Sequence, residues 1–126
     1  MNTELEKKII DIISGNILTP IIYMIEQEEI LDFICFCDRN ITIQEIYDVE
    51  KKIRTETGKK VEIVDIREFG AAERLEVLSN ARLIYTEHPI IEKIFVQSMS
   101  DDLKNAMEKR QDVLDRYRES GCVYLQ

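Results

Sequence analysis

Asp32 has the clearest chemical potential in this chain, because it lies inside the otherwise apolar segment 30–37. A carboxylate in such a segment is costly unless it is paired, hydrogen-bonded or bound to a metal ion. Side chains alternate between the two faces of a strand, so one register of two parallel strands places Asp32 beside Glu62 of the later segment 61–66. Two neighbouring carboxylates are suitable ligands for a hard cation such as Mg²⁺. This arrangement predicts a metal site formed by Asp32 and Glu62.

Asp32 also has an ordinary structural interpretation. At the open end of a strand, a carboxylate accepts a hydrogen bond from a backbone amide or from water, and structural networks contain buried carboxylates as well. On these residues alone, the structural interpretation is favoured over the metal site. Cys35 and Cys37 lie on the strand face opposite Asp32 and are expected to pack in the core. No Cys and His spacing resembles a zinc site, and His88 precedes Pro89 at an expected helix start.

The elements that must position these residues follow from hydrophobic spacing and capping signals. Thr3 with Glu6, and Thr42 with Glu45, have the spacing of a capping box. The apolar run 30–37 is typical of a strand covered on both faces, near the centre of a sheet. A strand, a helix and another strand then predict a parallel crossover. The expected elements are a helix over 4–14, strands over 21–25 and 30–37, a helix ending at Gly58, a strand over 61–66, a helix over 71–79, a strand over 81–85 and a helical segment over 89–120.

This order predicts an α/β (α+β) fold with a small mixed sheet flanked by helices. The 126 residues form a single expected domain, 1–126, with a core over 20–87. The 17 Lys and Arg against 25 Asp and Glu give a net charge of −8, which argues against nucleic acid as a direct partner. No apolar run is long enough for a membrane span, and three cysteines, an odd number, favour a reducing cytoplasm.

Three segments of the chain form a pattern together, namely Asp38–Ile46 (DRNITIQEI), Lys59–Arg67 (KKVEIVDIR) and Glu73–Tyr85 (ERLEVLSNARLIY). The pattern resembles the minimal nucleotidyltransferases, small polymerase-β-like proteins often paired with HEPN partners in toxin–antitoxin modules. The resemblance is strongest over residues 30–87 and extends over roughly 20–120. The order and spacing of the three segments carry the resemblance. The resemblance implies a nucleotidyltransferase-like fold.

The resemblance also implies where a catalytic site would lie. The family has Gly-Ser after its first strand, Asp-x-Asp in its second and an acidic residue in its third. The carboxylates hold Mg²⁺ and the Gly-Ser turn holds the nucleotide phosphates. In this chain the second Asp corresponds to Asp32 and the third carboxylate to Glu62. The first Asp corresponds to Ile30, and segment 21–29 contains neither Gly nor Ser.

These departures predict a weakened or lost active site. A missing glycine turn keeps backbone amides away from phosphates, and a missing Asp removes one metal ligand. In place of the turn stand Glu26, Glu28 and Glu29, which would repel a nucleotide. Glu28 shares strand parity with Asp32, so a shifted triad of Glu28, Asp32 and Glu62 is an alternative. An extended strand would hold Glu28 about 13 Å from Asp32, so the triad needs a bend in the turn.

The first functional hypothesis is an antitoxin-like protein that binds a HEPN-type toxin, with little or no catalysis and no cofactor. Its acidic charge would assist encounter with a basic partner. The second is an active enzyme that uses Mg²⁺ and ATP to modify a protein hydroxyl, and the third is a self-associating structural module. The amphipathic stretch 110–117 fits either packing against the sheet or a dimer or partner surface.

Overall fold

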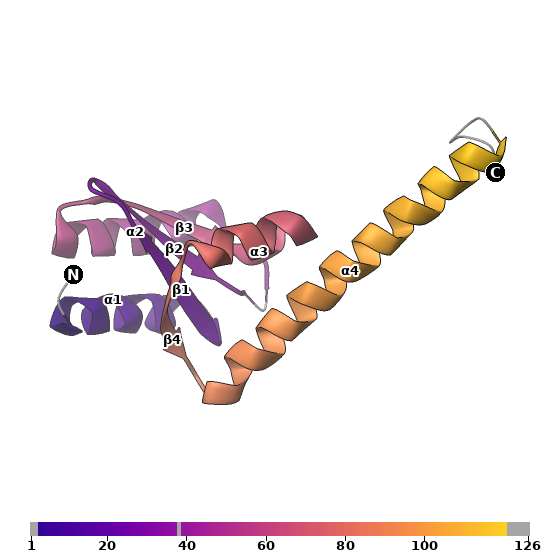
Figure 1. The fold of residues 1–126 in the computed structure, drawn as a ribbon. Helices are drawn as coiled ribbons and strands as arrows, with labels where there is room; N and C mark the ends of the chain where they lie inside the picture. The colour runs from indigo at the N-terminus through magenta and orange to yellow at the C-terminus, as the bar shows by residue number, and fades with distance from the viewer. Residues whose placement is uncertain (1–2, 38, 121–126) are drawn as a thin grey trace.

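The protein folds around one four-stranded mixed sheet, and the computed structural model describes residues 3–37 and 39–120 (Figure 1). The strands are β1 (Ile21–Glu26), β2 (Ile30–Cys35), β3 (Lys60–Asp65) and β4 (Arg82–Thr86). They stand in the order β3–β2–β1–β4. β1 is antiparallel to both β2 and β4, whereas β2 and β3 run parallel. The predicted mixed sheet, its parallel crossover and the interior position of the second strand are therefore confirmed.

Two helices cover one face of the sheet, namely α1 (Thr3–Asn16) and α2 (Ile43–Thr57). Their inner side chains pack with those of the central strands because apolar residues recur every three or four positions along each helix. Cys35 and Cys37 belong to this cluster, which confirms their predicted place in the core. Fully buried members of the cluster include Ile9, Ile13, Ile22, Leu31, Phe33 and Ile53.

The sequence sets both ends of α2. The side chain of Thr42 accepts a hydrogen bond of 3.1 Å from the N–H of Glu45, which satisfies one of the helix's unpaired amides. Gly58 ends the helix in the left-handed conformation, with φ of +69°, and its N–H donates to the carbonyl of Arg54. α2 therefore delivers the chain directly to the start of β3 beside β2.

The other face of the sheet is covered by α3 (Ala71–Ser79) and by the first half of α4 (Pro89–Ser120). A short 3-10 turn, Ile66–Glu68, connects β3 to this layer. The bounds of α3 are those that the sequence predicts. The buried side chains of this second cluster are Ile21, Tyr23, Ile34, Ile66 and Met99.

The second half of α4 extends away from the rest of the molecule (Figure 1). Met107, Leu114 and Tyr117 expose 63%, 39% and 48% of their surface. The interpretation in which stretch 110–117 packs against the sheet is therefore wrong, and the partner-surface alternative remains. In the described part of the chain, neither α4 nor any other helix has the long apolar stretch that a membrane-crossing helix needs.

Candidate functional site

Asp32 and Glu62 are direct neighbours in the parallel β2–β3 pair, as one of the predicted registers requires. Asp32 lies on the same face of the sheet as Ile34, a member of the cluster under α3 and α4. Asp32 is half-buried and Glu62 is exposed. The strand pairing therefore brings the two residues side by side, and the carboxyl group of Asp32 is partly shielded from water.

The environment of Asp32 disfavours its charged form. Its Oδ1 is buried and has no hydrogen-bond partner. Burial, followed by the charge and the hydrogen-bond contact of Glu62, raises the pKa of Asp32 above its ordinary value. When both carboxyl groups are ionised, two negative charges lie next to each other. A bound cation, or a proton retained by one of the groups, would reduce this repulsion.

Glu50 on α2 is a third carboxyl group in this electrostatic neighbourhood, and sequence reasoning missed it. Burial and the charge of Glu62 raise the pKa of Glu50, whereas the backbone of Ile63 and the charge of Arg54 oppose the increase. No local pattern marks Glu50, because only the packing of α2 beside β3 brings it close. Among the described residues, no three His, Cys, Asp or Glu side chains form a group that could hold a metal ion.

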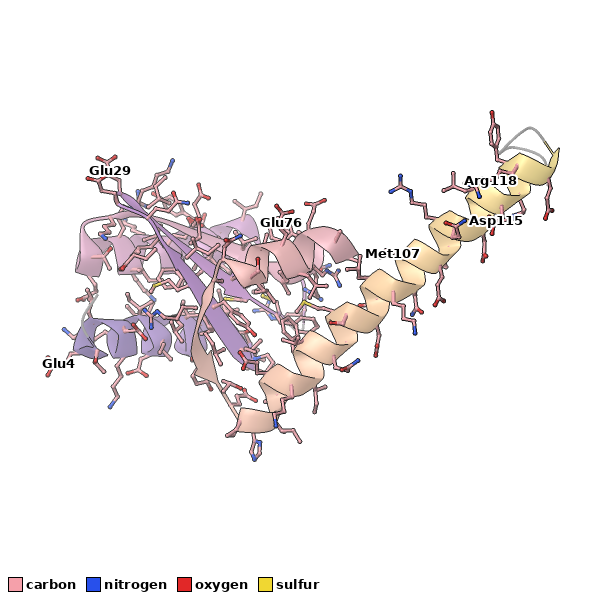
Figure 2. All side chains as sticks on the ribbon, in the orientation of Figure 1. Glu4, Glu29, Glu76, Met107, Asp115 and Arg118 are labelled. Carbon is pink, nitrogen blue, oxygen red and sulfur yellow. The ribbon has the colours of Figure 1, made fainter. Side chains whose placement is uncertain are left out.

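The turn between β1 and β2 is the position at which the sequence resemblance implied a phosphate-binding loop. It is a tight connection, in which the N–H of Gln27 donates to the carbonyl of Ile30 at 2.9 Å. The carbonyl of Glu29 accepts from the N–H of Lys60 on β3, at 3.1 Å. Figure 2 shows Glu29 at the tip of this hairpin. The side chains of Glu26, Glu28 and Glu29 are exposed here, so an approaching triphosphate meets negative charge.

The other two positions of the predicted site do not supply ligands. Ile30 is apolar and half-buried at the start of β2. Glu28 lies in the bend outside both strands and does not join Asp32 and Glu62 in a three-carboxylate group. The shifted triad is therefore not assembled. Two adjacent carboxylates are a partial fit to Mg²⁺, which proteins hold with one or two carboxylates together with substrate phosphates.

The end of the sheet opposite this hairpin carries a largely apolar hollow of about 530 Å³. Arg67 lies at its edge, donates to Asp65 Oδ2 from Nε at 2.9 Å and Nη2 at 2.7 Å, and also donates to the carbonyl of Arg39. Burial would raise the pKa of Asp65, but its hydrogen bonds and charge contact with Arg67 hold that pKa below its ordinary value. Asp65 is therefore a structural anchor rather than an available base. The hollow is lined mainly by apolar side chains, including Pro20, Phe36, Ile66, Ile91, Phe95 and Met99.

No protein-family model matches this sequence. No curated protein matches it at the level of sequence either.

Solved structures do match. A chain of the crystal structure of the toxin–antitoxin pair MntA–HepT superposes with a TM-score of 0.72 and 16% identity, over 93% of this chain and 99% of that one. A chain of the complex between a tri-AMPylated HEPN toxin from Shewanella oneidensis and its MNT antitoxin gives a TM-score of 0.73 and 17% identity, over 94% and 99%. A toxin–antitoxin structure with AMP-PNP gives 0.70 and 16%, over 90% and 98%.

This chain has the minimal nucleotidyltransferase fold. The predicted fold class is thereby confirmed. Because identity is below 20%, the likeness concerns the backbone arrangement, and the chemistry must be argued from this chain's own residues.

Proposed function

We propose that this protein is an antitoxin-like member of the minimal nucleotidyltransferase fold that acts in the cytoplasm by binding a HEPN-domain toxin. Solved structures of this fold supply the first support, because their chains come from toxin–antitoxin complexes. The exposed apolar half of α4 supplies the second, because it is a surface that a protein partner would cover.

We further propose that nucleotide transfer is absent or weak in this chain. The observation that carries this proposal is the closed hairpin at Gln27–Glu29, which replaces an amide-lined loop with exposed carboxylates. Asp32 and Glu62 offer two metal ligands, but the first family position holds Ile30. A site that lacks both a ligand and a phosphate-binding loop cannot offset the charge of a triphosphate.

Two measurements test the proposal. The HEPN-domain protein encoded next to this chain in its genome of origin should bind the purified chain with a Kd in or below the micromolar range. The absence of such a gene, or of any binding, would count against the antitoxin role. Calorimetry with Mg²⁺ and ATP should give no saturable heat at millimolar nucleotide. Tight binding that needs the metal and disappears in Asp32→Ala would instead support the enzyme.

The second candidate function is transfer of AMP from ATP to a protein hydroxyl. The direct pairing of Asp32 with Glu62 and the orphaned Asp32 Oδ1 favour it, since Mg²⁺ would satisfy both. When bound, the metal would supply positive charge against the nucleotide phosphates, held by these two side chains. In this reaction the hydroxyl oxygen bonds the α-phosphorus and pyrophosphate leaves. Incubation of chain and HEPN partner with ATP radiolabelled at the α-phosphate decides between the two functions, because only the enzyme leaves label on the partner.

A further inference from the structure

The outer half of α4, residues 103–120, carries an apolar stripe that Arg110 interrupts, and we call this half the arm. At about 100° of rotation per residue, Leu103, Met107, Leu114 and Tyr117 fall within about 40° of a single line along the helix. Ala106 and Val113 widen the stripe on one side, and Val113 exposes 40% of its surface. A stripe of this width is typical of a helix that packs against other helices.

The stripe continues the face through which α4 already packs. Phe95 and Met99 belong to the cluster beneath α3 and α4. Leu103 comes next and is half-buried, and it shares a hollow with Leu75 of α3 and with Met107. Beyond Met107 the described residues bring no further element against the helix (Figure 2). Beyond Met107 the packing face therefore leaves the domain, and residues 108–120 continue it as an unpaired surface about 20 Å long, at 1.5 Å per residue over 13 residues.

The charges nearest the stripe are basic, whereas Lys109 and Arg116 lie on the far side of the helix among the acidic side chains. Arg110 lies within the stripe, and Lys104 and Arg118 lie along one edge of it. The acidic side chains of the arm are all at least about 120° away from the middle of the stripe. They are Glu108, Asp112, Asp115 and Glu119. Arg118 approaches Asp115 within 3.8 Å, so its charge is partly balanced, whereas Arg110 forms no ion pair within the described part of the chain. The contact face is thus basic.

This charge pattern indicates which kind of surface can pack against the stripe. In a pair of arms from two copies, the stripes would bring Lys104, Arg110 and Arg118 against one another, and like charges across a helix interface are unfavourable. An apolar surface edged by carboxylates fits the same face without this penalty. The arm has five Lys and Arg against four Asp and Glu, whereas the whole chain has 17 against 25. The arm is therefore the part of an acidic protein that an acidic partner can approach.

We propose that the arm docks into an apolar groove between helices of the partner, with carboxylates of the partner facing Arg110 and the basic edge. The inference rests on the proposed function, because it assigns the surface through which that function is carried out. It also reverses the expectation that overall acidity drives encounter with a basic toxin.

The test measures the affinity of the purified full chain for the neighbouring HEPN-domain protein, used as the probe. Arg110→Glu and Leu114→Ser should each weaken binding at least about tenfold, because both change the centre of the stripe. The matched controls are Lys109→Glu, the same charge reversal about 120° away on the same helix, and Ile43→Ser, a truncation of another apolar residue, which is 88% exposed on α2. Both controls should bind as the unaltered chain does, and circular dichroism checks that all four variants fold.

The outcomes separate this inference from the proposed function. Binding by the unaltered chain that Arg110→Glu and Leu114→Ser leave unchanged overturns the arm as the docking surface and leaves the antitoxin role standing. Absence of binding by the unaltered chain overturns both. If sedimentation equilibrium finds a dimer of the chain alone that Leu114→Ser dissociates, the occupant is a second copy and the proposed partner chemistry is wrong.

Discussion

Asp32 and Glu62 stand opposite each other on the two parallel strands β2 and β3, and the charge of Glu62 acts on a carboxyl group that is already partly buried. The native state therefore holds Asp32 in its protonated form more readily than the unfolded chain does. A raised native pKa of a carboxyl group gives stability that is fully present below the unfolded pKa and is lost as the pH rises through the native pKa. The pair is thus a cost to the fold at neutral pH.

Asp32→Asn should stabilise the protein at neutral pH. The amide keeps the shape of the carboxyl group, removes the like-charge contact with Glu62 and carries no charge to be desolvated. We expect a rise in Tm on the order of 3 °C at pH 7.5, and a smaller rise at pH 4, because Asp32 takes up a proton as the pH falls through its raised pKa. Thermal unfolding followed by circular dichroism at both pH values measures this. A loss of stability at pH 7.5 would mean that the Asp32 carboxylate has a favourable partner.

Thr19 supplies a second stability test. It is buried, its hydroxyl donates to the carbonyl of Ile21 at 2.7 Å and it accepts from the N–H of Phe36 at 3.1 Å. Thr19→Val leaves the amide of Phe36 and the carbonyl of Ile21 without these partners, so we expect a loss of about 1–3 kcal/mol in the free energy of unfolding. Urea denaturation measures it. Thr19→Ser keeps the hydroxyl and should lose clearly less, and equal losses would assign the effect to the methyl group.

Substitution of Gly58 and of Gly15 by alanine should have opposite effects on stability. Gly58 has a φ of +69° at the end of α2, where a side chain is strained, so Gly58→Ala should destabilise the protein by about 1 kcal/mol. Gly15 is helical within α1, and a methyl group there meets no atom within 4 Å, so Gly15→Ala should stabilise by roughly 0.5–1 kcal/mol. Chemical denaturation of both variants compares them directly. Effects of the same sign would contradict the backbone argument.

Shortening α4 tests whether its outer half contributes to the domain. Residues 112–119, the part of the deleted segment 112–126 whose side chains are described, are all exposed. Removal of 112–126 should therefore change the free energy of unfolding by less than about 0.5 kcal/mol. The helical signal in circular dichroism should nevertheless fall, because part of a long helix is gone. A large loss of stability would show that the deleted segment packs on the domain.

Several parts of this structure could be predicted from local sequence because local and tertiary requirements coincide. The alternation along β2 and β3, together with a helix between them, limits Asp32 and Glu62 to few registers. The cap at Thr42 needs only the amide three residues later. The end of β2 was expected at Cys37 but falls at Cys35, because the N–H of Phe36 bonds the side chain of Thr19 instead of a neighbouring strand.

Other features depend on contacts that the sequence does not reveal. The spacing of Thr3 and Glu6 is that of a capping box, yet the carboxylate of Glu6 accepts two hydrogen bonds, of 3.1 and 2.9 Å, from Arg82 on β4. The contribution of Glu50 appears only when α2 packs beside β3. The outer stripe of α4 has the same apolar spacing whether it meets the sheet or a foreign protein, so periodicity left both alternatives open.

The length of α4 has a geometric consequence for assembly. The proposed docking surface extends about 20 Å beyond the globular body, so a partner bound at its outer end would not contact that body. With this docking mode, several copies of the chain could bind a partner that offers several grooves without contact between their globular bodies. The number of grooves on the partner would then limit the stoichiometry of the complex.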